Sequence, residues 1–131
     1  MRTILVVDDE QEVLTFVESA LRRLGFEVIL ALAGDEALRL FEKQPLVIDM
    51  LLTDVVMPGI SGPMLVDRIL AIQPSLPVLF MSGYDDRQVV QRYVLKEGFA
   101  LLPNPFTLET LSAKVQELLP NMPVNRKSQS A

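Results

Sequence analysis

Short apolar runs that alternate with helical segments constrain the fold of this chain more than any other feature of its sequence. The runs are TILVV (3–7), EVILA (27–31), LVIDMLLTD (46–54), PVLFMS (77–82) and FALL (99–102). Near-continuous apolar strands are typical of a parallel sheet that is buried on both faces. The sequence therefore predicts an α/β fold, with helices on both faces of a doubly wound five-stranded parallel sheet. We expect the flavodoxin-like strand order 2-1-3-4-5, one of the two common orders of such sheets.

Helices are expected between these strands and after the last one. Apolar residues recur at helical spacing over 11–26, and Gly25 suits the end of that helix. Further helices are expected from residue 34, over 63–72, over 86–97 with Gly98 as the stop, and over 107–119 with Thr107 as N-cap. Residues 1–119 are thus expected to form one domain. The polar, proline-bearing segment 120–131 is expected to be a disordered tail.

Composition excludes several classes of chemistry. The 131 residues include no cysteine and no histidine, which excludes disulfides, thiolate metal sites, histidine metal sites and a Ser-His-Asp triad. Twelve basic residues against 17 acidic ones give a net charge of −5, which argues against direct nucleic-acid binding. The N-terminal apolar run is too short for a signal peptide, and Asp49 interrupts the run at 46–54. We therefore expect a cytoplasmic protein with no membrane segment.

Acidic residues follow the first and third strands. Asp8 and Asp9 come directly after 3–7, and Asp54 ends 46–54. With order 2-1-3-4-5 these strands are neighbours at the switch point of the sheet, so the three carboxylates converge. Their mutual repulsion needs an offsetting charge, and Mg²⁺ accepts such oxygen ligands. The alternative is that the paired acids only cap the next helix.

Two further strands end in polar residues at the same edge. Ser82 ends 77–82, and Asn104 follows 99–102. With these residues in place, the stretches ILVVDDE, LLTDVVMPGISG, VLFMSGY and LLPNPF resemble, in order and spacing, the response-regulator receiver domain of two-component signalling. The resemblance covers roughly residues 2 to 119, and TDVVMPGISG with LFMSGY is similar to receivers of hybrid sensor histidine kinases.

The resemblance implies a role for each of these residues. Asp54 would be the phosphoacceptor. Asp9 would bind Mg²⁺ directly, Asp8 mainly through water, and the backbone carbonyl of Val56 would complete the protein ligands. Ser82 would be the switch hydroxyl. Because the chain has no histidine, the phosphoryl group would come from a phosphohistidine on a sensor histidine kinase or a histidine phosphotransfer protein.

The chain departs from the family pattern at two positions. Asn104 stands where the family has an active-site lysine, so the charge-assisted hydrogen bond of that lysine would be lost. Such a bond is worth roughly 1.5–3 kcal/mol, so its loss would weaken the phosphorylated state about 10- to 100-fold. Arg87, near the start of the fourth helix and just after Ser82, is a candidate to replace the cation of that lysine. Lys96 is a poorer candidate, because it lies near the end of the same helix. Leu101 stands where the family often has a switch aromatic, and Tyr84 is the nearest aromatic that could gate the site instead. The Asn104-Pro105 bond is expected to be cis, as the family's Lys-Pro bond is.

Two functions of different class follow. The first is a phosphoacceptor domain, not an enzyme in its own right, that takes a phosphoryl group on Asp54 with Mg²⁺. Phosphorylation would switch a partner-binding face made by the fourth helix, fifth strand and fifth helix, in a monomer or weak dimer. The second is a degenerate receiver that binds proteins without phosphorylation, as Asn104 and Leu101 suggest. A flavin-binding domain is a weaker third reading, because DDEQE after the first strand is the opposite of a phosphate-binding loop.

Overall fold

A five-stranded parallel sheet forms the centre of the molecule in the computed structural model, which describes residues 2–43, 47–83 and 87–119. The strands are β1 (Thr3–Val7), β2 (Glu27–Ala31), β3 (Met50–Asp54), β4 (Val78–Ser82) and β5 (Ala100–Pro103). They lie in the order β2-β1-β3-β4-β5, and all four neighbouring pairs are parallel. The predicted fold class and strand order are confirmed.

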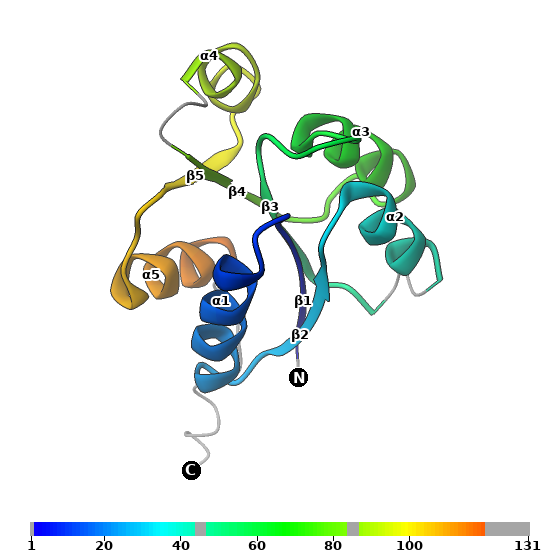
Figure 1. The fold of residues 1–131 in the computed structure, drawn as a ribbon. Helices are drawn as coiled ribbons and strands as arrows, with labels where there is room; N and C mark the ends of the chain where they lie inside the picture. The colour runs from blue at the N-terminus through cyan, green and yellow to red at the C-terminus, as the bar shows by residue number, and fades with distance from the viewer. Residues whose placement is uncertain (1, 44–46, 84–86, 120–131) are drawn as a thin grey trace.

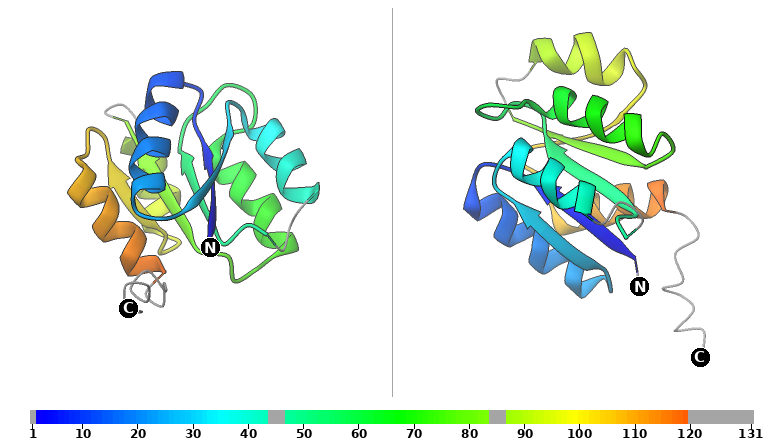
Figure 2. Two further views of the ribbon diagram at one scale, coloured as in Figure 1. Left: turned by 90° about the horizontal axis from the view of Figure 1, so that it is seen from below. Right: turned by 90° about the vertical axis from the view of Figure 1, so that its right-hand side faces the viewer.

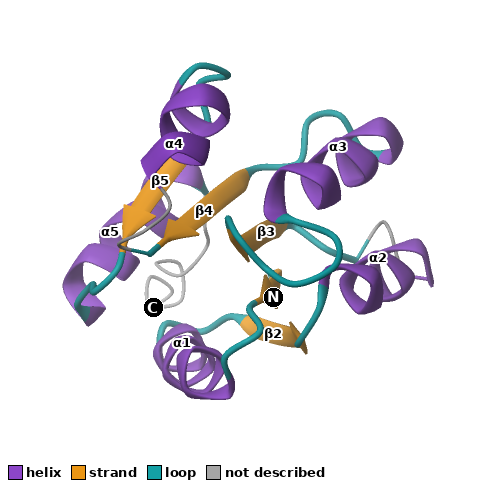
Figure 3. Ribbon diagram, turned by 45° about the horizontal axis from the view of Figure 1, so that its top comes forward, coloured by secondary structure: helices purple, strands orange, loops and turns teal. Residues whose placement is uncertain are grey.

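Helices cover both faces of the sheet (Figures 1 and 3). The helices are α1 (Gln11–Arg23), α2 (Gly34–Lys43), α3 (Gly62–Ile72), α4 (Arg87–Val89), which continues as the π-helix η1 (Val90–Leu95), and α5 (Leu108–Leu118). Figure 2 shows the same layers from two further directions, with helices on either side of the strands. Gly25 and Gly98 have φ values of +96° and +82°, so both act as the helix stops that were predicted.

Alternate residues of each strand feed two separate cores, because successive side chains of a strand point to opposite faces. Leu5, Val7 and Phe80 belong to the core under α2, α3 and α4. Ile4 and Val6 belong to the core under α1 and α5. This double burial accounts for the near-continuous apolar character of the strand sequences.

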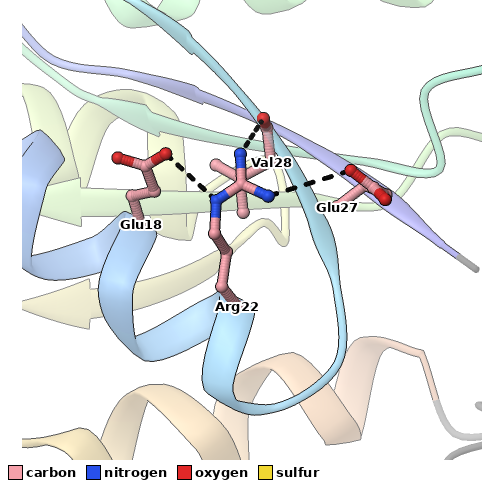
Figure 4. A network of polar contacts seen from close by, with 4 residues as sticks. All are labelled: Glu18, Arg22, Glu27 and Val28. Carbon is pink, nitrogen blue, oxygen red and sulfur yellow. Dashed lines mark hydrogen bonds and ion pairs between the residues drawn. The ribbon is translucent and has the colours of Figure 1, made fainter.

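Arg22 fastens the end of α1 to β2 (Figure 4). Its Nε donates to Glu18 Oε2 at 3.0 Å, and its Nη2 donates to the Val28 carbonyl at 3.2 Å. Its Nη1 also lies 3.8 Å from Glu27 Oε1. The network joins the last turn of α1 to β2, and a basic residue in that turn also interacts favourably with the helix dipole.

Several boundaries differ from the sequence-based expectation. The third strand is shorter, starting at Met50, and β5 is shifted by one residue. The fourth helix is α-helical only over Arg87–Val89 and then widens into a π-helix. The β-branched Val89 and Val90 favour a regular α-helix weakly, and Val90 and Val94 of the widened turn are both buried. The predicted tail at 120–131 lies outside the described residues, so its disorder stays a prediction.

Candidate functional site

The loop after β1 places one buried and one exposed carboxylate side by side. Asp8 is only 2% exposed, whereas Asp9 is exposed. Asp8 Oδ1 accepts a hydrogen bond from the Glu10 backbone N–H at 2.8 Å. Burial raises the pKa of Asp8 to about 6; the Glu10 N–H opposes that rise, and the charges of Asp9 and Glu10 add to it. The pocket therefore disfavours the charged form of Asp8 unless a cation binds beside it.

The end of β3 brings Asp54 to the same edge. Val7 pairs with Thr53 in the parallel register of β1 and β3, so each strand delivers its next residue to the same edge of the sheet. Asp54 Oδ1 accepts from the Val55 N–H at 2.9 Å, and the side chain is partly buried. The turn after Asp54 is held by a hydrogen bond from the Gly62 N–H to the Val55 carbonyl at 2.9 Å.

Gly62 is required by the close packing of this turn. A Cβ at position 62 would overlap the Asp54 carbonyl oxygen and would lie 3.0 Å from Val55 Cα. A side chain here would push the start of α3 away from the strand that carries Asp54. Gly62, the last residue of the sequence stretch MPGISG, thus helps to set the position of Asp54.

The three predicted carboxylates do converge. Asp8, Asp9 and Asp54 each offer one oxygen, and these oxygens lie within 4.8 Å of one another. Oxygen atoms in this arrangement suit a hard divalent cation such as Mg²⁺, which also keeps several waters. Val56 lies two residues beyond Asp54, and its side chain is half exposed; the role of its carbonyl as a ligand stays a prediction.

Ser82 and Asn104 meet at the adjoining strand ends. Ser82 is 6% exposed, and its carbonyl accepts a hydrogen bond from the Asn104 N–H at 2.8 Å. The Asn104-Pro105 peptide bond is cis. Ser82 and Asn104 also line a common cavity of about 250 Å³, together with Arg87 and Leu101. Leu101 is partly buried and packs against the core under α4. Tyr84 lies outside the described residues.

A second concavity was not predicted from the sequence. It measures about 230 Å³, lies between α1 and the segment after β5, and is lined by Phe16, Asn104 and Phe106 among others. The rings of Phe16 and Phe106 are 5.9 Å apart, and Phe16 is 44% exposed. The only signal in the sequence is an aromatic at a helix position outside the apolar stripe. Asn104 borders both concavities.

This fold and edge define a doubly wound α/β protein with a carboxylate site at its switch point. Residues 4–116 match the family model of the response regulator receiver domain. The sensor kinase CckA of Brucella abortus is 34% identical over 117 residues, which is 89% of this chain and 12% of that protein. NtrC of Azospirillum brasilense, a DNA-binding transcriptional regulator, is 35% identical over 89% of this chain and 24% of its own length.

Solved structures agree with these sequence matches. A response regulator receiver domain protein from Clostridium thermocellum superposes with a TM-score of 0.83 at 31% identity and covers all of both chains. The receiver domain of the hybrid histidine kinase CckA gives a TM-score of 0.75 at 34% identity, covering 89% of this chain and 98% of that one. The chain belongs to the receiver domain family of two-component signalling.

The chain spans about an eighth to a half of the length of several curated relatives, from 12% of CckA to 49% of the mycobacterial regulator PrrA. In those relatives the matched region is therefore one part of a longer protein. Within the described ranges, none of the helices has the length and apolar character needed to cross a membrane.

Proposed function

We propose that this receiver domain accepts a phosphoryl group on Asp54 from a phosphohistidine. The convergence of the Asp8, Asp9 and Asp54 carboxylates carries the proposal, because it puts a nucleophile beside a cation site at one sheet edge. Asp9 would bind Mg²⁺ directly, Asp8 chiefly through water, and the Val56 carbonyl would complete the protein ligands. The bound cation would supply the positive charge that phosphoryl transfer requires.

The transfer would run as an in-line displacement. An Asp54 carboxylate oxygen attacks phosphorus, a P–O bond forms, and the P–N bond to the donor imidazole breaks. The imidazole leaves with a proton from solvent. The donor is a histidine kinase or histidine phosphotransfer protein, since this chain has no histidine. The similarity to CckA supports a hybrid kinase as one parent protein.

Phosphorylation would then shift the population of two forms of one surface. Ser82 would bond to the phosphoryl group through its hydroxyl, and its direct backbone contact with Asn104 would link that event to β5. The output would be read by a protein partner on the face of α4, β5 and α5, in a cytoplasmic monomer or weak dimer. The net charge of −5 fits a protein partner better than nucleic acid.

A degenerate receiver is the second candidate, and Asn104 is the observation that favours it. An amide offers hydrogen-bond donors but no charge, so the phosphorylated form would lose stabilisation. Leu101 likewise has no hydroxyl to bury or release. In this case the domain would bind its partner in one conformation, whether or not Asp54 is phosphorylated.

Intact-protein mass measurement separates the two candidates. Wild type, Asp54→Asn and Asn104→Lys are exposed to acetyl phosphate and, separately, to phosphoramidate, each with Mg²⁺. The proposal predicts one phosphoryl adduct on wild type that Asp54→Asn abolishes. An adduct on Asn104→Lys alone would establish the degenerate receiver. No adduct on any protein with either donor would refute the phosphoacceptor function.

A further inference from the structure

Charge balance at the carboxylate site leaves a deficit of positive charge. Asp8, Asp9 and Asp54 contribute three negative charges, and a divalent cation offsets only two of them. A phosphoryl group on Asp54 adds anionic oxygens that must be stabilised as the bond forms. Asn104, which stands at the end of β5, adds no charge. A further cation from another part of the chain would therefore stabilise a phosphorylated form of this domain.

Arg87 is the basic residue that the fold brings to this edge. It is the first residue of α4 and borders the 250 Å³ cavity that Ser82 and Asn104 also line. Arg22, Arg39 and Lys114 have ion-pair partners elsewhere, and none of the other described basic residues lines this cavity. Arg87 is exposed and forms no ion pair with any residue in the described ranges.

The walls of this cavity suit an arginine side chain. Val90 and Leu101 give it an apolar side, whereas Ser82 and Asn104 give it a polar end. An arginine can lay its aliphatic stem along apolar surface and keep its charged head at a polar end. The guanidinium also reaches further than the short amide side chain of Asn104. Leu101 lines the cavity from β5, and Arg87 lines it from α4.

We propose that Arg87 binds the phosphoryl group on Asp54 and supplies the cation that Asn104 lacks. This inference rests on the proposed phosphoacceptor function. The guanidinium would enter along the cavity and pair with phosphoryl oxygens beside the Ser82 hydroxyl, where its planar fork can make two parallel hydrogen bonds. In this account Asn104 contributes amide donors, and the charge comes from the start of α4 instead of the end of β5.

The test measures binding of an acyl-phosphate analogue, beryllium fluoride with Mg²⁺, by ¹⁹F NMR titration. Arg87→Gln is compared with Arg92→Gln, which removes the same charge from an exposed site in η1 that does not border the cavity. Loss of a charge-assisted hydrogen bond predicts about 10-fold weaker binding for Arg87→Gln and less than about 2-fold change for Arg92→Gln. Adding Asn104→Lys to Arg87→Gln should restore the affinity.

The same set of variants distinguishes the two ways in which the account can fail. If wild type binds the analogue and Arg87→Gln matches Arg92→Gln, the role of Arg87 is wrong and the phosphoacceptor function stands. If Asn104→Lys fails to rescue Arg87→Gln, the two positions do not share one charge requirement, which also overturns the inference. If wild type neither binds the analogue nor forms the mass adduct, the proposed function fails and the inference fails with it.

Discussion

Replacing Asp8 by asparagine should stabilise the domain in the absence of divalent cation. Asp8 is buried at the edge of the sheet, and that burial raises its pKa from 3.8 to about 6. The folded protein therefore holds the Asp8 proton more tightly than the unfolded chain does. Asparagine has nearly the same shape and can still accept the hydrogen bond from the Glu10 N–H at 2.8 Å. The substitution thus removes the charge and keeps the contact.

The sign of the pH dependence follows from that raised pKa. Below about pH 3 Asp8 is largely protonated in both states and costs little. As pH rises from 3.8 to about 6 the unfolded chain releases its proton first, so the free energy of unfolding of wild type falls. One pKa unit corresponds to about 1.4 kcal/mol, so the advantage of Asp8→Asn over wild type should grow by about 2 kcal/mol between pH 4 and pH 7.

Urea unfolding of both proteins at pH 4, 5.5 and 7 in EDTA measures this difference. Adding Mg²⁺ at pH 7 should raise the midpoint of wild type, because a bound ligand stabilises the folded state, and should raise the midpoint of Asp8→Asn less, because one carboxylate of the site has lost its charge. Asp49→Asn is a control for the loss of one carboxylate outside the site. A difference between Asp8→Asn and wild type that does not change from pH 4 to pH 7 would refute this reasoning.

Two further substitutions test the surroundings of the site by urea unfolding. Gly62→Ala should destabilise the fold by about 1–3 kcal/mol, because its Cβ would meet the Asp54 carbonyl. The control Met64→Ala, at an exposed position of the same helix, should cost much less. Equal effects of the two substitutions would contradict the packing argument. Tyr93→Phe removes the hydrogen bond from the Tyr93 hydroxyl to Asp67 Oδ1 at 2.9 Å, which joins η1 to α3, and should cost about 0.5–1.5 kcal/mol. An Asp67→Asn change on the Tyr93→Phe background should then add almost nothing, and an additive loss would show that the two residues act separately.

The fold was accessible from the sequence because local pattern and global burial agree. β1 and β2 have the predicted bounds, since each is a compact apolar run between polar or glycine-bearing segments. The convergence of Asp8, Asp9 and Asp54 follows from strand order alone, because parallel strands end at one edge. The sequence alone therefore places Asp8 and Asp9, which follow strand one, near Asp54, which ends strand three.

Other features depend on packing that a linear pattern does not contain. The sequence does not distinguish Asp8 from Asp9, yet in the folded protein Asp8 is buried and Asp9 is exposed. The π-helix of η1 breaks no hydrophobic period, since Val90 and Val94 remain buried in the widened turn. The cavity beside Ser82 arises only when α4 and β5 are placed against each other. The sequence suggests Arg87 as a substitute cation, but only the cavity that it shares with Ser82 and Asn104 supports the proposal that it binds the phosphoryl group.

The most direct test of the account is the chemical position of the phosphoryl group. Borohydride reduces an aspartyl phosphate to homoserine, and peptide sequencing by mass spectrometry then identifies the modified residue. After treatment with phosphoramidate and Mg²⁺, the account predicts homoserine at position 54 alone, and none when EDTA replaces Mg²⁺. Homoserine at position 8 or 9, or none at position 54 in a protein that carries the mass adduct, would contradict it.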